Sequence, residues 1–423
     1  MRSNPFLILI IFSLIILLID FYAFRGVKKL IVNLNGSVKR FIKILFWIIP
    51  ILLIAELAFI PLLRNSIDPA EFLIYFHYFS GTFILFYIPK LIFIVFNFFD
   101  DIIHGAVHIF SRKKKQNIDN TDSQKISRSQ FLTRIGIIMA GIPFISIAYG
   151  IGWGRFNLKV RNVNLKFINL PKEFNGLKVI QISDFHIGSL LNHPDFVEEI
   201  IEKVNSLNPD ILLFTGDFVN NVSEEMDNFL SLLSNFKSKL GKYSILGNHD
   251  YGEYVPWKSE KERLANLNRL KELERNIGFD LLLNENRKII IGNEEIELIG
   301  VENWGLPPFP QYGDLKKAME NTEQNSFKIL MSHDPTHWDA QVLDHSNIDL
   351  TLSGHTHGAQ FGIEIPGWRW SPVNLRYKRW GGLYTEGNQN LYVNTGIGYI
   401  GFPGRVGMPP EITILELSSN SNS

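Results

Sequence analysis

Hydrophobic residues are unevenly distributed along this chain. The N-terminal third is strongly apolar, whereas the remainder mixes apolar and polar positions as a globular domain does. A helix needs about 20 apolar residues to cross the hydrocarbon core of a bilayer. Four segments have that character and predict four transmembrane helices: 5–24, 41–63, 72–99 and 134–153. We therefore expect an α-helical membrane region, residues 1–156, and a second domain, residues 157–423.

The loops between these predicted helices differ in charge. Basic residues gather within 25–43 and within 112–134, while the short loop between the second and third helices has Arg64 against Asp68 and Glu71. Positively charged loops remain in the cytoplasm, so the second domain of this multi-pass protein is expected outside the cytoplasm. This expectation depends on the fourth segment, which is shorter and rich in glycine. If that segment did not span, the second domain would lie in the cytoplasm.

The amino-acid composition limits the partners and the metal ligands that the chain can have. The 42 Lys and Arg residues balance the 42 Asp and Glu residues, so bulk charge does not favour nucleic acid as a partner. The chain has no cysteine, which excludes disulfides, thiolate metal sites and cysteine nucleophiles. A metal ion would therefore have to be held by His, Asp, Glu or Asn.

The second domain alternates two hydrophobic patterns. Short runs rich in β-branched residues predict buried strands at 176–183, 210–216, 242–247, 328–332 and 348–354. Apolar residues at helical spacing predict helices at 193–209, 223–236 and around 264–273. The alternation of strands and helices indicates a layered α/β fold.

Polar side chains follow five of these strands. They are of types that bind metal ions: Asp184, His186, Asp217, Asn248, His249, Asp250, His333, His355 and His357. Any one of them, taken singly, is typical of a turn or a helix cap. Together they are hard to explain by packing alone. Because ligands bind beyond the carboxyl ends of strands in open α/β sheets, these residues predict a functional site.

The order of these residues resembles the signature of the calcineurin-like metallophosphoesterases, in particular a bacterial membrane-associated branch. That family has D-x-H, then G-D, G-N-H-[DE], a single H and G-H-x-H. In this chain the five blocks appear in the same order: Asp184-Phe185-His186, Gly216-Asp217, Gly247-Asn248-His249-Asp250, His333 and Gly354-His355-Thr356-His357. The resemblance covers residues 157–417. It implies two mixed β-sheets packed as a sandwich and flanked by helices, in a protein of a bacterial inner or cell membrane.

The resemblance also implies roles for individual residues. Two ligand sets would hold two divalent metal ions: Asp184, His186 and His357 for one, and Asn248, His333 and His355 for the other. Asp217 would bridge both ions. His249 would contact the substrate and act on its leaving oxygen, and Asp250 or another carboxylate would orient His249. Mixed nitrogen and oxygen ligands suit Mn, Fe, Zn or Ni and do not choose among them.

Such a site has the charge that phosphoester hydrolysis needs. Two divalent ions bring a charge of about +4, and Asp184 and Asp217 are the only anionic ligands, which leaves roughly +2. That excess attracts a phosphate and lowers the pKa of a bridging water, which makes hydroxide the nucleophile. No protein nucleophile is then required.

The substrate is less well defined by the sequence. The segment 368–380 interleaves tryptophans and a tyrosine with basic residues, as membrane interfaces favour. It is either a bilayer-facing loop that admits a lipid-linked phosphoester or a partly packed surface loop. Arg405 is a candidate phosphate contact.

Three functions are compatible with these features. The first is a membrane-anchored two-metal phosphoesterase that hydrolyses a phosphodiester or phosphomonoester, including a lipid-linked one. The second is a pyrophosphohydrolase for a nucleotide-linked lipid, which would favour a cytoplasmic active site. The third is a metal-binding sensor or scaffold without turnover, against which the presence of His249 argues. The expected partners are the bilayer and a phosphoester substrate, and the sequence does not define the oligomeric state.

Overall fold

The computed structural model describes residues 5–64, 66–67, 69–110 and 128–419. The described contacts divide the chain into a helical unit (Met1–Asp68 and Tyr75–Tyr149) and a sheet unit (Pro69–Ile74 and Gly150–Ser423). The domain boundary expected after residue 156 stays a prediction. Most of the basic residues expected in the second cytoplasmic loop, from Arg112 to Lys125, lie outside the described residues.

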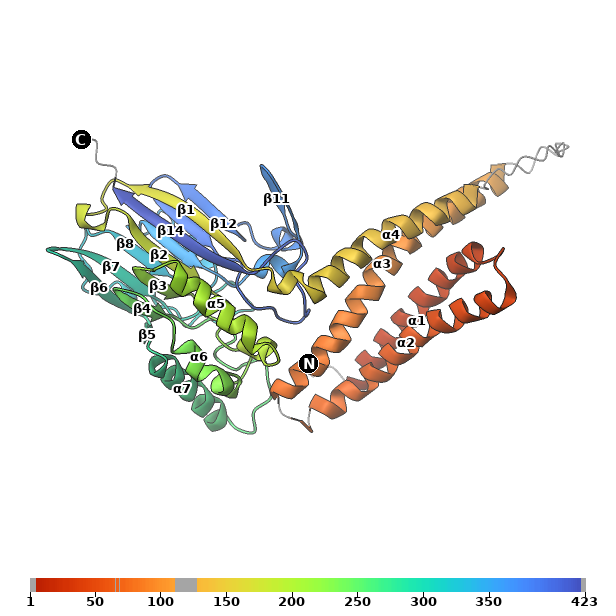
Figure 1. Ribbon diagram of the computed structural model, residues 1–423, viewed down its shortest axis with the longest axis horizontal. Coiled ribbons are helices and arrows are strands. Elements are labelled where there is room, and N and C mark those ends of the chain that lie inside the picture. Colours follow the sequence, from red (N-terminus) through yellow and green to blue (C-terminus); the bar gives the residue numbers. More distant parts are fainter. Residues whose placement is uncertain (1–4, 65, 68, 111–127, 420–423) are drawn as a thin grey trace. The chain divides into compact units, whose positions relative to one another are not determined.

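Four long helices form the helical unit (Figure 1). They are α1 (Pro5–Leu30), α2 (Gly36–Arg64), α3 (Pro69–Phe110) and α4 (Arg128–Gly152). Each contains a stretch long and apolar enough to cross a bilayer, of 22, 28, 37 and 25 residues respectively. The prediction of four apolar helices is confirmed, including the fourth.

A charged pair lies inside the helical unit. Lys90 of α3 places Nζ 2.6 Å from Oδ1 of Asp20 in α1, and the Tyr87 hydroxyl donates a hydrogen bond to the same carboxylate. Asp20 is fully buried. Because an isolated charge in an apolar environment is costly, such groups occur paired. The pairing accounts for a lysine within an apolar helix.

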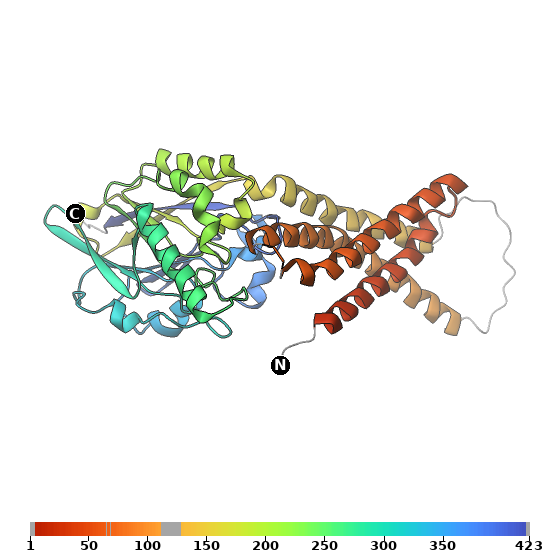
Figure 2. The same cartoon turned by 90° about the horizontal axis from the view of Figure 1, so that it is seen from below.

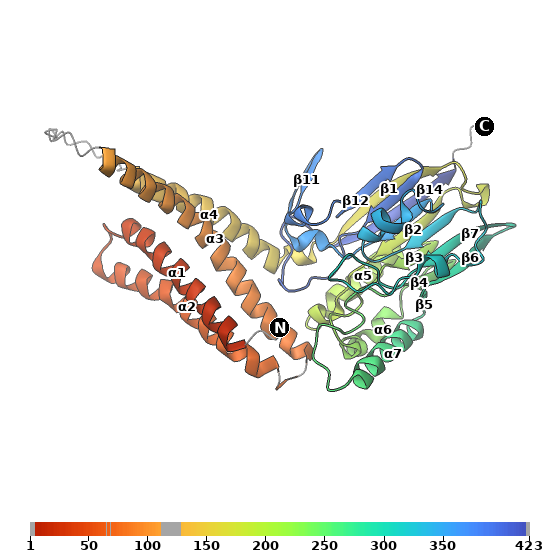
Figure 3. The same ribbon diagram turned by 180° about the vertical axis from the view of Figure 1, so that it is seen from behind.

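The sheet unit contains two six-stranded sheets and a small two-stranded one (Figures 1 and 3). The first sheet has the order β1 (Lys159–Phe167), β14 (Glu411–Ser419), β2 (Leu177–Ile182), β3 (Ile211–Phe214), β4 (Gly241–Ser244) and β5 (Asp280–Leu281). The second has the order β12 (Gly382–Glu386), β13 (Gln389–Val393), β9 (Leu350–Ser353), β8 (Lys328–Met331), β7 (Glu294–Gly300) and β6 (Glu285–Ile291). The small sheet pairs β10 (Ile363–Ile365) with β11 (Trp368–Trp370).

The two large sheets pack face to face. Val179 and Leu213 of the first sheet belong to one buried cluster with Ile329 and Leu352 of the second. Neighbouring positions on the same strands, such as Ile180, point to the opposite face, as the two-residue period of a strand requires. Both sheets contain parallel and antiparallel pairs. The predicted sandwich of two mixed sheets is therefore confirmed.

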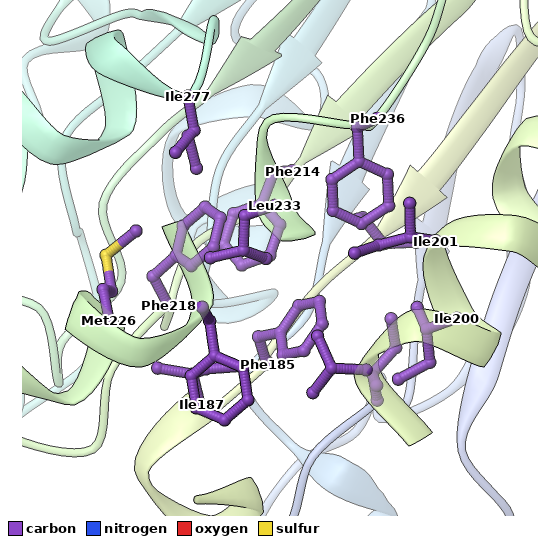
Figure 4. Close-up of a cluster of buried hydrophobic side chains, with 14 of the residues drawn as sticks. Phe185, Ile187, Ile200, Ile201, Phe214, Phe218, Met226, Leu233, Phe236 and Ile277 are labelled. Carbon is purple, nitrogen blue, oxygen red and sulfur yellow. The ribbon is translucent and has the colours of Figure 1, made fainter. Parts of the chain in front are cut away.

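Helices cover the outer face of the first sheet (Figure 2). They are α5 (Pro194–Ser206), α6 (Leu230–Leu233) and α7 (Glu260–Asn276), while α8 (Leu315–Ala318) belongs to the cluster outside the second sheet. The apolar side of α5 packs into the core shown in Figure 4, where Ile200 and Ile201 lie close to Phe185 and Phe214. This burial explains why α5 forms: its apolar residues recur at the helical period.

One predicted helix is largely wrong. The segment 223–236 forms a 3-10 helix, Ser223–Phe229, and then only one turn of α-helix. The Glu225 carboxylate accepts hydrogen bonds from the backbone N–H groups of Asn220, Asn221 and Val222, and these bonds fix the chain in a tight non-α turn. The other short helical segments are η1 (Gly154–Phe156), η2 (Lys172–Phe174), η3 (Ile187–Leu190), η5 (Trp338–Val342), η6 (His357–Gln360) and η7 (Pro372–Leu375).

Strand direction positions the site. In the first sheet β2, β3 and β4 are parallel, and in the second β8 and β9 are parallel. Each of these strands is short, and a loop follows it at its carboxyl end. The loops after all five strands therefore supply side chains to one edge of the sandwich.

Candidate functional site

The loops after these five strands bring the predicted ligands together. Among the described residues, two groups place carboxylate and imidazole atoms within 4.8 Å of one another: Asp184, His186 and His357, and Asp217, His333 and His355. Asn248 joins the second group, with its Oδ1 2.8 Å from Nδ1 of His355. All seven residues predicted as metal ligands thus lie in one cluster, although they come from both sheets.

The first group converges tightly. Nε2 of His186 lies 3.0 Å from Nε2 of His357, and Nε2 of His357 lies 3.2 Å from Oδ1 of Asp184. All three residues are buried, and Nδ1 of His186 has no hydrogen-bond partner. Ring nitrogens that face each other beside a carboxylate are poorly satisfied by one another. Together they fit the donor set of a divalent metal ion.

Asp217 lies between the two groups. Its Oδ2 is 3.1 Å from Nε2 of His333 in the second group and 3.6 Å from Nε2 of His186 in the first. Its other carboxylate oxygen accepts a hydrogen bond from the backbone N–H of His249 over 2.8 Å. One carboxylate therefore faces ligands of both groups, as a bridging residue would.

Outer partners fix the rings of two histidines. Nδ1 of His333 lies 2.7 Å from the carbonyl oxygen of Thr215, which can only accept, so the proton resides on Nδ1 and Nε2 points toward Asp217. Nε2 of His355 lies 2.8 Å from the Tyr377 hydroxyl. Partners of this kind orient metal ligands and set which nitrogen is available.

His249 and Asp250 differ in their surroundings. Nδ1 of His249 lies 2.7 Å from the carbonyl oxygen of Asn220, which leaves Nε2 as the nitrogen available to a substrate. The Asp250 carboxylate instead accepts hydrogen bonds from four backbone N–H groups: Asp217, Phe218, Val219 and Gly247. The structure therefore does not place Asp250 beside His249 as an orienting group. It gives that contact to Asn220, and Asp250 ties the loops after β3 and β4 together.

Buried charges shift the titration of the cluster. Burial alone would raise the pKa of Asp217, but His333 and the other nearby imidazoles hold it well below its usual range. Burial would lower the pKa of His333, but the adjacent Asp217 carboxylate raises it to about 10. Burial lowers the pKa of both His186 and His355. Without metal, the carboxylates of the cluster are thus ionised, and His333 carries a second ring proton, on Nε2. Metal binding would displace that proton.

The ligand loops adopt unusual backbone conformations. The φ angle is positive at five of the predicted ligands: Asp184 (51°), His186 (43°), Asp217 (61°), His355 (72°) and His357 (51°). Residues other than glycine rarely adopt this region, and each such residue costs about 1–3 kcal/mol of conformational free energy. Gly354 is needed for close approach, since a Cβ there would overlap Ser183 and the Asp184 carboxylate. The surrounding packing holds these loops in place.

A pocket of about 440 Å³ opens over the cluster. Asp217, Asn248, His249, His355 and His357 line its polar part. Its remaining walls are largely apolar or aromatic and include Tyr254, Phe309, Tyr377 and Ile400. Arg376 contributes the only guanidinium among the lining residues. No motif marks Arg376 as a site residue, and its signal in the sequence is its place within the aromatic and basic segment 368–380.

Arg405 does not line this pocket. Its side chain is 1% exposed, and its guanidinium donates hydrogen bonds to the carbonyl oxygens of Thr395 and Gly398. Nη2 also lies 3.2 Å from Nδ1 of His357. A guanidinium fully engaged with the protein interior cannot reach a phosphate in the pocket, in contrast to the expectation from the sequence.

A two-sheet sandwich whose strand ends gather aspartates, histidines and an asparagine beneath a pocket defines a metal-dependent phosphoester hydrolase. Comparison with known proteins agrees: the chain belongs to the calcineurin-like phosphoesterase family. The family profile matches residues 177–359, and a profile described as the transmembrane domain of a probable calcineurin-like phosphoesterase matches residues 1–155. The protein is a membrane metallophosphoesterase, which confirms the resemblance drawn from the motifs.

One bacterial relative matches nearly the whole chain, and others match a part of it. The chain is 28% identical to the uncharacterized metallophosphoesterase Cj0846 of Campylobacter jejuni, over 97% of this chain and 99% of that one. It is 32% identical to an uncharacterized metallophosphoesterase of Helicobacter pylori, over 71% and 74% of the two chains. It is 31% identical to the UDP-2,3-diacylglucosamine pyrophosphatase LpxG of Chlamydia trachomatis, over 58% of this chain and 86% of the relative.

Proposed function

We propose that this chain hydrolyses a phosphodiester or phosphomonoester at a two-metal site. The observation that carries the proposal is the position of Asp217, whose Oδ2 faces His333 and His186, one histidine from each ligand group. The proposed ligands are Asp184, His186 and His357 for one ion and Asn248, His333 and His355 for the other, with Asp217 shared. When bound, divalent ions would supply Lewis-acid activation of water and neutralise phosphoryl charge.

The residues of the chain prepare this chemistry. Thr215 holds the proton of His333 on Nδ1, which leaves Nε2 free for a ligand role, and the Tyr377 hydroxyl, 2.8 Å from Nε2 of His355, orients that ring. The carbonyl of Asn220 likewise holds the proton of His249 on Nδ1. Once Nε2 is also protonated, His249 would present an N–H to the leaving oxygen and either donate that proton or stabilise the developing charge.

We propose a lipid-linked phosphoester as the substrate. The pocket combines a polar floor with apolar walls at Phe309 and Ile400, and Arg376 stands on the same lining. A phosphate would lie near the floor, and an acyl or prenyl portion would contact the walls. Arg376 is the cation placed to contact a second phosphate or a neighbouring anionic group.

A second candidate follows from the relatives. The LpxG proteins of Chlamydia trachomatis and Chlamydia muridarum, at 31% and 29% identity, are named as pyrophosphatases of a nucleotide-linked diacylated sugar. That observation favours a pyrophosphohydrolase acting on a nucleotide-linked lipid. The same site would then cleave the bond between two phosphoryl groups.

The side of the membrane separates these candidates. The basic loops support a sheet unit outside the cytoplasm, whereas a nucleotide-linked substrate favours the cytoplasm. The chain has no cysteine, so a single introduced one is a unique label. In intact cells, an impermeant maleimide should label Ile290→Cys, an exposed site on β6, if the sheet unit lies outside; labelling only after lysis would place it in the cytoplasm.

Catalysis is tested with the full-length protein in lipid nanodiscs. With Mn²⁺, it should hydrolyse a chromogenic phosphodiester, and Asp217→Ala should abolish both turnover and the binding of two ions. Asp227→Ala removes a surface carboxylate that pairs with Arg269 and is the matched control. Full activity in Asp217→Ala would refute the two-metal proposal. A panel of lipid-linked phosphoesters and nucleotide-linked lipids then distinguishes the two substrate classes.

A further inference from the structure

The small sheet β10–β11 has an exposed apolar face. Ile363 pairs with Trp370, and Ile365 pairs with Trp368. Residues two apart on a strand share a face, and directly paired residues lie on the same side, so all four side chains lie together. They are between 39% and 55% exposed. In Figures 1 and 3 the β11 strand projects away from both large sheets of the unit.

The opposite face attaches this hairpin to the sheet unit. Glu364 forms two hydrogen bonds with the Arg161 guanidinium of β1, at 2.9 and 2.6 Å. The guanidinium of Arg369 lies over the ring of Trp380, 4.8 Å from its centroid. These contacts involve only the polar face. The hairpin is therefore fixed in orientation, and the side chains of its apolar face remain about half exposed.

We propose that this face docks into the surface of the lipid bilayer. The attachment point supports a membrane as the occupant, because Arg161 follows Gly152, the last residue of the membrane-spanning helix α4, by nine positions (161 − 152). An extended chain covers at most about 3.6 Å per residue. Arg161 on β1, the residue that binds Glu364 of the hairpin, therefore lies within about 30 Å of the end of a transmembrane helix.

The chemistry of the face matches a lipid interface. Tryptophan is enriched where headgroups meet acyl chains, since its ring is apolar and its N–H is polar. Exposed basic residues, Arg376 and Lys378, follow shortly after β11 and would attract anionic headgroups. A face of four side chains is small for a stable protein interface, which buries about 800 Å² on each partner. Insertion at the headgroup boundary requires only a short apolar face.

The hairpin also borders the proposed active site. Ala359 and Gln360 precede β10, Arg376 and Tyr377 follow β11, and all four line the pocket over the ligand cluster. Docking of the hairpin would therefore hold one wall of the pocket at the lipid–water boundary. A pocket in that position would bind amphiphilic phosphoesters of the membrane in preference to soluble phosphoesters. The substrate preference rests on the proposed function, whereas docking itself does not.

Depth measurements test the docking directly. Ile365→Cys, carrying a spin label, is compared with Ile290→Cys, an isoleucine of similar exposure (59% against 55%) on β6. Each full-length variant is placed, one copy per disc, in nanodiscs of phosphatidylethanolamine and phosphatidylglycerol. Collisions with oxygen, which partitions into lipid, and with a water-soluble nickel chelate report the depth of the label. Trp368→Cys, on the same face, provides a second site.

At residues 365 and 368, we expect collisions with nickel to be lost and collisions with oxygen to increase, relative to residue 290. Equal nickel accessibility at all three sites would overturn the proposal. Protection that appears only with two copies per disc would also overturn it, because the face would then be an interface between chains. None of these measurements depends on turnover, so a failure of the proposed hydrolase function remains distinguishable.

Discussion

Arg405 donates a hydrogen bond through Nη2 to Nδ1 of His357 over 3.2 Å. A guanidinium carries only donors, so Nδ1 of His357 must be the acceptor, and the ring is held with Nε2 directed at Asp184. The remaining guanidinium donors are used by interior carbonyl groups, including those of Thr395 and Gly398. The arginine expected to bind a phosphate is thus a positioning residue for a proposed metal ligand.

Replacing this arginine should reduce stability. Arg405→Met would leave buried carbonyl groups without donors, and we expect the free energy of unfolding to fall by about 3 kcal/mol. Arg376→Met, an exposed change at the pocket, is the matched control and should alter stability by less than about 0.5 kcal/mol. Urea unfolding of the purified chains, followed by tryptophan fluorescence, measures both. Equal stability of the two variants would contradict the positioning role.

His249→Ala should separate catalysis from metal binding. His249 contacts Asn220 and lines the pocket but belongs to neither ligand group, so both ions should remain bound while turnover falls about 10²–10⁴-fold. The loss should be smaller for a nitrophenyl ester than for an alkyl ester, because nitrophenolate leaves without needing a proton. Metal analysis and initial rates provide the readouts. Loss of an ion from this variant would show that His249 is itself a ligand.

Tyr377→Phe should weaken metal binding without disturbing the fold. It removes the hydroxyl that lies 2.8 Å from Nε2 of His355, and the loss of such a partner typically lowers metal affinity 10–100-fold, as an order of magnitude. Asp334, with Oδ2 3.5 Å from the same nitrogen, would be a weaker substitute. Tyr384→Phe is the control, since its hydroxyl accepts from the backbone of Trp380 instead. Calorimetric titration with Mn²⁺ should show the difference, and identical affinities would refute it.

His337 should make stability depend on pH. Burial lowers the pKa of this histidine to about 4 in the folded chain, against 6.5 for an ordinary histidine. Between these values the unfolded chain takes up a proton that the folded chain does not. Its contribution to stability is therefore complete above pH 6.5 and is lost as the pH falls to 4, by about 3 kcal/mol in total.

The pH effect is measured by unfolding at pH 7.5 and pH 4.5 in the presence of a chelator, so that release of metal does not contribute. His337→Gln should reduce the pH dependence but not remove it, because burial also lowers the pKa of His186 and His355. His345→Gln, which changes an exposed histidine, should leave the dependence as it is in the unmodified chain. An unchanged slope in His337→Gln would assign the effect to other groups.

The sequence predicted the composition of the site well because motif residues follow strands directly. A short apolar run ending in Asp184 or His333 fixes both the strand and the place of the side chain beyond it. The same reasoning failed for arginines: charge is visible in a sequence, but the direction of a long side chain is not. Arg405 turns into the interior, and Arg376 reaches the pocket.

Histidines outside the motifs show the same limit. His337 matches no motif, and it is fully buried, with its ring against Trp304 and Nδ1 2.8 Å from Ser332 Oγ. The segment 368–380 contains both buried and exposed aromatic residues. Tyr377 and Trp380 pack inside, while Trp368 and Trp370 remain exposed. Local patterns do not reveal which side chains distant segments will cover.

The positive φ angles at the proposed ligands have a consequence for how such a chain changes over generations. The backbone has a conformation that glycine adopts at lower energy at Asp184, His186, Asp217, His355 and His357. A chain released from the need to bind metal could relax each position by substitution and become more stable as it lost the reaction. This chain has all five side chains in these conformations. Selection for turnover would maintain them despite their cost in stability.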